Sequence, residues 1–103
     1  MAQTFEDLLC ERDVLILDGA VGTELERRGV ALPLPVWTGD AAVRAPGVLR
    51  GIYLDYLQAG VDIVTACTWR TQPYVLRAVG REAEAAALTR RAVDIAREAC
   101  ATA

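Results

Sequence analysis

Four branched apolar residues, Val14 to Leu17, are followed directly by an acid and a glycine, Asp18 and Gly19. Such a run is typical of a strand that is buried on both faces, as in a parallel sheet. In α/β proteins, the loops after such strands carry the side chains that bind ligands. The pattern therefore makes Asp18 a candidate site residue. The alternative is a plain strand-to-helix turn in which Asp18 only shapes the backbone.

The rest of the chain predicts helices that alternate with one further strand. The opening helix is expected over residues 4–12, with Thr4 as its N-cap. Apolar spacing and glycine stops predict further helices over 24–28, 39–44, 47–59 and 81–101, a short helix ending at 79, and a second strand over 61–66. The buried face of the last helix is expected to hold Ala85, Leu88, Ala92, Ile95, Ala96 and Ala99.

These elements make a βαβ unit with a helix at each end, which is an incomplete fold by itself. A two-stranded parallel sheet has two open edges and two largely uncovered faces. We therefore expect the chain to be the first part of a larger alternating α/β domain, or to complete itself by association with another chain.

Composition narrows the classes of function. With 103 residues there is room for one small domain, and the net charge of −3 argues against nucleic-acid and membrane partners. All eleven basic residues are arginine, so no lysine Schiff base and no histidine base or ligand is available. The amino terminus resembles no signal peptide and no run has the length of a membrane span, so a cytoplasmic location is expected. Cys10, Cys67 and Cys100 form no Cys-x-x-Cys pair, so neither a disulfide framework nor a self-contained zinc site is indicated.

Four segments together resemble the homocysteine S-methyltransferase family. The family includes betaine–homocysteine and S-methylmethionine–homocysteine methyltransferases and the homocysteine module of cobalamin-dependent methionine synthase. The resemblance rests on residues 15–29 (LILDGAVGTELERRG), 34–38 (LPVWT), 52–65 (IYLDYLQAGVDIVT) and 68–73 (TWRTQP), which follow the order and spacing of the family. Each segment alone is a weak signal, and it is their common register that carries the resemblance.

The resemblance implies a (β/α)₈ barrel, a fold of about 250 residues, of which this chain would supply the opening helix and two βα units. Residues 1–103 would then be a partial homocysteine-binding domain that ends before the third barrel strand. In the family, zinc holds the sulfur of homocysteine as a thiolate, which takes a methyl group from a donor to form methionine. Zinc coordination makes a thiol nucleophilic at neutral pH.

The zinc cysteines of the family lie in later strands, and no matching text is present in this sequence. Cys67 falls at the expected mouth of the barrel but has no partner ligand in view, so we do not expect it to bind zinc. The isolated chain is therefore expected to be inactive, with no catalytic residue of its own. The alternative function is a non-catalytic remnant that acts as an assembly or binding module and self-associates through exposed sheet edges.

The resemblance also assigns substrate-binding roles to residues in three loops. These residues are Asp18 and Gly19 after the first strand, Trp37 and Thr38 at the end of the proline-rich loop that starts at Val30, and Thr68 and Trp69 after the second strand. A carboxylate at Asp18 would pair with the ammonium group of an amino acid. Two alternatives stay open at this point: Trp37 as a packing residue, and Thr38 as only the N-cap of the helix that follows.

Overall fold

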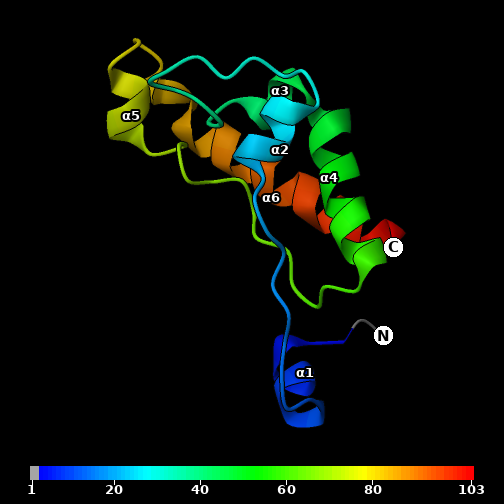
Figure 1. Ribbon diagram of the computed structural model, residues 1–103. Helices are drawn as coiled ribbons and strands as arrows, with labels where there is room; N and C mark the ends of the chain where they lie inside the picture. Colours follow the sequence, from blue (N-terminus) through cyan, green and yellow to red (C-terminus); the bar gives the residue numbers. More distant parts are fainter. Residues whose placement is uncertain (1–2) are drawn as a thin grey trace.

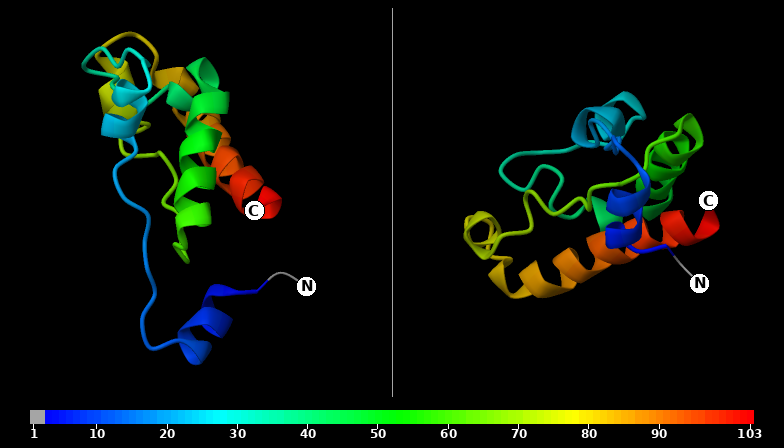
Figure 2. Two further views of the ribbon diagram at one scale, coloured as in Figure 1. Left: turned by 45° about the vertical axis from the view of Figure 1, so that its right-hand side comes forward. Right: turned by 90° about the horizontal axis from the view of Figure 1, so that it is seen from below.

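The computed structural model describes residues 3–103, which form an elongated molecule of 46 × 26 × 21 Å. Its helices are α1 (Phe5–Glu11), α2 (Gly22–Arg27), α3 (Ala41–Arg44), α4 (Pro46–Ala59), α5 (Pro73–Arg77) and α6 (Ala85–Thr102), with a 3₁₀ turn η1 (Glu82–Glu84) before α6. Helices α2 to α6 gather in one body, while α1 lies apart from them at the end of an extended segment (Figure 1). Helices α4 and α6 pack side by side, as all three views show (Figure 2).

The core lies between α4 and α6, and its members follow the predicted spacing. The buried residues of α4 are Leu49, Ile52 and Tyr53, and those of α6 are Ala85, Leu88, Ala92, Ile95, Ala96 and Ala99, as predicted. Small residues along α6 allow the two helices to approach closely. Gly60 ends α4 in the left-handed conformation, with φ of 107°.

The two predicted strands, over residues 14–17 and 61–66, are the main correction to the expected fold. No strand is present within residues 3–103, where the two segments run parallel and meet in a single bridge between Leu17 and Ile63. Around that bridge, the Asp18 amide donates to the Ile63 carbonyl at 3.0 Å, and the Asp62 amide donates to the Ile16 carbonyl at 2.8 Å. Two such segments with no third neighbour do not form a regular sheet.

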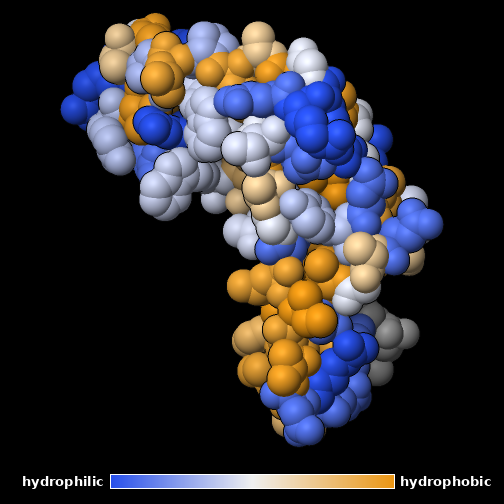
Figure 3. Space-filling model, in the orientation of Figure 1, coloured by the Kyte–Doolittle hydropathy of each residue, from blue (hydrophilic) through white to orange (hydrophobic). Residues whose placement is uncertain are grey.

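The expectation that the first strand is buried on both faces is also wrong for this structure. Val14, Ile16 and Leu17 are 72%, 55% and 60% exposed. Together with Phe5 and Leu9 of α1 they form an apolar surface on the part of the molecule that projects from the helical body (Figure 3). The carboxyl ends of both segments, by contrast, run into the helical body, where the candidate site lies.

The first and third helices differ in how well they match the sequence. Thr4 caps α1, as predicted. The structure adds a capping box with Asp7, in which each side chain accepts from the other residue's amide at 3.1 Å. Helix α3 begins at Ala41, two residues later than expected. The position before it is Asp40, and the Thr38 side chain makes no cap.

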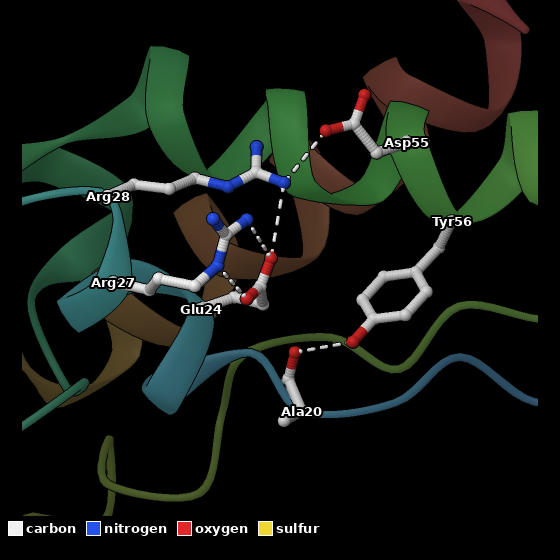
Figure 4. Close-up of polar contacts among 6 residues, drawn as sticks. All are labelled: Ala20, Glu24, Arg27, Arg28, Asp55 and Tyr56. Carbon is white, nitrogen blue, oxygen red and sulfur yellow. Dashed lines mark hydrogen bonds and ion pairs between the residues drawn. The ribbon is translucent and has the colours of Figure 1, made fainter.

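A polar cluster joins α2 to α4. Glu24 accepts hydrogen bonds from Arg27 and Arg28, and Arg28 also donates to Asp55 of α4 at 2.7 Å (Figure 4). The hydrogen bond from Arg27 is the largest cause that lowers the pKa of Glu24 to about 2. Because α2 begins at Gly22, three residues after Gly19, this cluster fixes the start of the candidate site against α4.

Candidate functional site

The six residues predicted to bind substrate line a single pocket. The hollow has a volume of about 280 Å³, and its lining consists of Asp18, Gly19, Val21, Gly22, Trp37, Thr38, Thr65, Ala66, Cys67, Thr68 and Trp69. Three segments supply these side chains: the loop after the first extended segment, the proline-rich loop and the loop after the second extended segment. The structure thus brings together residues that lie up to 51 positions apart in the sequence.

Asp18 bridges two of these loops. One of its carboxylate oxygens accepts from the Thr65 amide at 3.0 Å, and the other accepts from the Thr65 hydroxyl at 3.0 Å. Asp18 is therefore more than a residue that shapes its own turn, because it holds the ends of both extended segments together. A carboxylate oxygen has two acceptor sites, so each oxygen retains capacity for a further donor from a ligand.

Trp37 packs against the start of α2. A Cβ at Gly22 would lie 2.5 Å from the Trp37 ring, so only glycine allows the indole to approach this closely. The indole Nε1 donates to Glu26 at 3.1 Å, and Trp37 adopts a φ of +49°, which is unusual for a side chain of its size. Trp37 therefore both packs against α2 and forms part of the pocket wall.

Thr38 and Cys67 meet at the floor of the pocket. Thr38 is only 3% exposed, and its carbonyl oxygen lies 3.9 Å from the Cys67 sulfur. Burial raises the pKa of the Cys67 thiol, so this thiol stays protonated at neutral pH. The alternative of Thr38 as only a helix cap is wrong here, because α3 begins at Ala41 and receives no side-chain bond from Thr38.

Trp69 and Thr68 form the outer rim. Trp69 is 71% exposed, so its indole offers a large apolar face to solvent. The Thr68 carbonyl accepts from the Thr71 hydroxyl at 3.2 Å, which tightens the loop behind Trp69. A pocket with one carboxylate, two indoles and several hydroxyls suits a small molecule that carries a cation and an apolar stem.

Two tyrosines of α4, for which the sequence pattern indicated no role at the site, hold this arrangement. Tyr53 donates to the Thr65 carbonyl at 2.8 Å. Tyr56 donates to the Ala20 carbonyl at 2.8 Å (Figure 4). A Cβ at Gly19 would lie 2.9 Å from the Tyr56 hydroxyl, so this glycine makes room for the tether. The sequence feature that could have predicted this role is the placement of both tyrosines on the apolar face of α4, because a tyrosine hydroxyl that packs into a core needs a hydrogen-bond partner.

The described residues do not form a metal centre. No group of three or more histidine, cysteine, aspartate or glutamate side chains within residues 3–103 is arranged to hold a metal ion. In the pocket, the lining includes one thiol, Cys67, and one carboxylate, Asp18, and Asp18 is bonded to Thr65. These residues therefore do not fit the ligand set of a zinc site, which takes three or four protein donors.

Comparison with known proteins identifies the family. The profile of the family described as homocysteine S-methyltransferase matches residues 15–103, and the chain belongs to this family. It is 38% identical over 93 residues to the homocysteine S-methyltransferase of Escherichia coli, a match that covers 89% of this chain and 30% of that protein. The selenocysteine methyltransferase of Astragalus bisulcatus is 38% identical over 85 residues, covering 82% of this chain and 25% of that protein.

A solved structure agrees with this assignment. The metallated form of the homocysteine methyltransferase MmuM from Escherichia coli superposes with a TM-score of 0.84 at 36% identity, covering 92% of this chain and 33% of that one. The chain thus spans about a third or less of the length of these relatives. The predicted family membership is confirmed.

Proposed function

We propose that this chain forms the amino-acid-binding wall of a homocysteine S-methyltransferase, in which homocysteine or a related thiol receives a methyl group. The observation that carries this proposal is the convergence of Asp18, Trp37, Thr38 and Trp69 on one pocket. In this pocket, Asp18 would pair with the ammonium group of the substrate, and the Trp37 indole would pack against its carbon stem.

The proposal gives these residues the tasks of binding and orientation. When bound, the zinc of such an enzyme would make the substrate thiol nucleophilic, and the product of methyl transfer to homocysteine is methionine. The described residues supply no ligand set for zinc, so we assign no metal-dependent step and no catalytic residue to them. Binding alone would hold the substrate sulfur in a fixed position relative to the methyl donor.

The cellular location of the chain and the extent of its domain are part of the same proposal. The three cysteines of the chain are free thiols, a state that suits the reducing conditions of the cytoplasm. No helix within residues 3–103 is both long enough and apolar enough to cross a membrane. We propose that residues 1–103 act as a partial homocysteine-binding domain.

A chimera tests the function directly. The matching stretch of the Escherichia coli homocysteine S-methyltransferase is replaced by residues 15–103 of this chain, and methylation of homocysteine is measured. We expect the chimera to be active. An Asp18→Asn substitution in it should raise the KM for homocysteine at least tenfold, because the ammonium group loses its ionic partner, a contact of about 1.5–3 kcal/mol.

Asp94→Asn is the matched control, because Asp94 lies within the transferred residues and is an exposed acid outside the pocket lining. It should leave the KM unchanged. The proposal is wrong if the chimera unfolds cooperatively yet has no activity, or if Asp18→Asn leaves the KM for homocysteine at the value of the parent chimera.

Association with a second copy is a separate candidate function, favoured by the apolar surface of α1 and residues 14–17. Five large apolar side chains there are at least half exposed: Phe5, Leu9, Val14, Ile16 and Leu17. Exposed patches of this kind mark association surfaces. Sedimentation velocity should then show a concentration-dependent dimer that a Leu17→Glu substitution abolishes, and a compact monomer at all concentrations would contradict the proposal.

A further inference from the structure

Arg70 has an unusual electrostatic environment for this chain. Eight of the eleven arginines form ion pairs with carboxylates, whereas Arg70, Arg90 and Arg97 have no such partner among the described residues. Arg70 is the one of these three that directly follows a residue of the candidate pocket, Trp69. Its positive charge is therefore available at the rim of that pocket.

The Arg70 side chain lines a second, smaller hollow. This hollow has a volume of about 220 Å³ and is lined by Trp69, Arg70, Gln72, Tyr74 and Val75. Because Trp69 lines both hollows, the second one adjoins the candidate homocysteine pocket.

The polar atoms of this second hollow are only partly satisfied. Nη1 of Arg70 donates to the Pro35 carbonyl at 3.4 Å, a long contact. Nε of Arg70 and Oε1 of Gln72 are buried and have no hydrogen-bond partner within residues 3–103. Guanidinium groups bind carboxylates through two parallel N–H donors, and on Arg70 the contact with Pro35 occupies only Nη1.

The backbone around Arg70 is held by its neighbours. A Cβ at Gly39 would lie 2.5 Å from the Arg70 carbonyl oxygen, so the proline-rich loop packs directly against this residue. The next residue, Thr71, is 4% exposed, and its hydroxyl accepts from the Thr89 hydroxyl at 2.8 Å. Because this backbone is already fixed, the loop itself need not become ordered when the guanidinium binds an anion.

We propose that this second hollow is a subsite for the carboxylate group of a small molecule, bound by the guanidinium of Arg70 beside Trp69. The subsite rests on the geometry of Arg70. Only the identity of the molecule that carries the carboxylate rests on the proposed function. Two sources are chemically equivalent: the carboxylate of homocysteine itself, and the carboxylate of a second reactant that binds beside it.

Nuclear magnetic resonance of the 103-residue chain tests the subsite. Sodium acetate is titrated into ¹⁵N-labelled protein against sodium chloride at equal ionic strength, and the Nε–H signals of Arg70 and Arg97 are followed. We expect acetate to shift the Arg70 signal saturably, with a dissociation constant in the millimolar range. Any shift of the Arg97 signal should give a dissociation constant that is at least tenfold higher. Equal responses of the two arginines, or equal effects of chloride and acetate on Arg70, would overturn the proposal.

Variants give a second readout through the indole signal of Trp69. Arg70→Gln should abolish the acetate-dependent shift of Trp69. Arg70→Lys should weaken it, because a lysine keeps the charge but cannot form two parallel bonds. Arg97→Gln is the matched control and should leave the shift intact. If Arg70→Gln does not fold, the comparison of Arg70 with Arg97 in the unmodified chain still decides the question.

A second titration identifies the source of the carboxylate. L-homocysteine is added with and without saturating acetate, and the amide signals of Gly19 and Thr38 report on the first pocket. Competition between the two ligands assigns the subsite to the carboxylate of homocysteine, and simultaneous binding assigns it to a second reactant. If homocysteine shifts neither amide while acetate still shifts Arg70, the proposed function fails for this chain and the subsite stands.

Discussion

The Asp18 carboxylate accepts hydrogen bonds from both the amide and the hydroxyl of Thr65, each at 3.0 Å. This pair closes the gap between two loops that lie 47 residues apart in the sequence. A side chain proposed to bind substrate is therefore also a structural link. Substitutions at Asp18 change the pocket and its support at once, so Thr65 is the better place to test the link alone.

Replacement of Thr65 by valine should destabilise the chain by about 1 kcal/mol, because it removes the hydroxyl donor and keeps the shape of the side chain. Thr65→Ser keeps the hydroxyl and is the matched control, with a smaller expected loss. Urea unfolding followed by circular dichroism measures both. If valine and serine have the same effect, the hydroxyl bond to Asp18 contributes nothing measurable.

Gly22→Ala should destabilise the chain by roughly 1–3 kcal/mol, because the new methyl group would overlap the Trp37 ring. The indole must then move, and we expect the tryptophan fluorescence to shift toward the emission of a solvated indole. Gly47→Ala serves as the control, since a Cβ at Gly47 meets no atom within 4 Å and α4 gains a better helix former. Thermal unfolding should show no loss for Gly47→Ala, and equal losses in both variants would contradict the packing argument.

The sequence predicts the helices of this chain better than its extended segments. The buried face of α6 follows from its own spacing, since Leu88 and Ile95 lie on one side of a single helix whatever surrounds it. Strand formation at Leu17 depends on neighbours on both sides, and the structure offers one partner, Ile63. A local sequence pattern therefore could not predict whether the two extended segments pair as regular strands.

The sequence predicted residues that line the candidate site, but not the tyrosines that hold its loops in place. Asp18 and Trp37 lie in segments whose register matches a known family, so their convergence was foreseeable. Tyr53 and Tyr56 tether the same loops through hydroxyl bonds to backbone carbonyls. Any residue can present a carbonyl, so no sequence pattern identifies the accepting positions, Thr65 and Ala20.

Stability should fall at alkaline pH, in part because of Tyr53. Burial is the largest cause that raises the pKa of Tyr53 above its ordinary value near 10. The folded chain thus keeps a proton that the unfolded chain releases. The contribution of Tyr53 to stability is complete below pH 10 and is lost as the pH rises further. Urea unfolding at pH 8, 9.5 and 10.5 should show this loss.

Tyr53→Phe isolates that contribution. The variant should be less stable than the parent at pH 8, because it lacks the 2.8 Å bond to the Thr65 carbonyl, and it should lose less stability between pH 9.5 and 10.5. Tyr74→Phe, a change at a residue that is 68% exposed, should behave like the parent at every pH. An alkaline loss of the same size in Tyr53→Phe and parent would assign the effect to other groups.

Alkylation should distinguish the cysteines. Cys10 is exposed on α1, whereas Cys67 is partly buried and burial raises the pKa of its thiol. Only the thiolate reacts with iodoacetamide, so at pH 8 we expect Cys10 to be modified at least tenfold faster than Cys67. Peptide mass spectrometry over time measures both rates, and the difference should vanish in 6 M urea. Comparable rates in the folded chain would mean that the floor of the pocket is open to solvent.

Helix α1 contains no buried residue and lies apart from the helical body (Figure 1). Its connection to the rest runs through the ion pair of Arg12 with Asp62 and the backbone bonds around the Leu17–Ile63 bridge. In native-state hydrogen exchange, the amides of α1 should therefore open locally and exchange first, while those of α6 exchange only when the whole core unfolds. The molecule is then two cooperative units of unequal stability, and the candidate pocket is built on the more stable one.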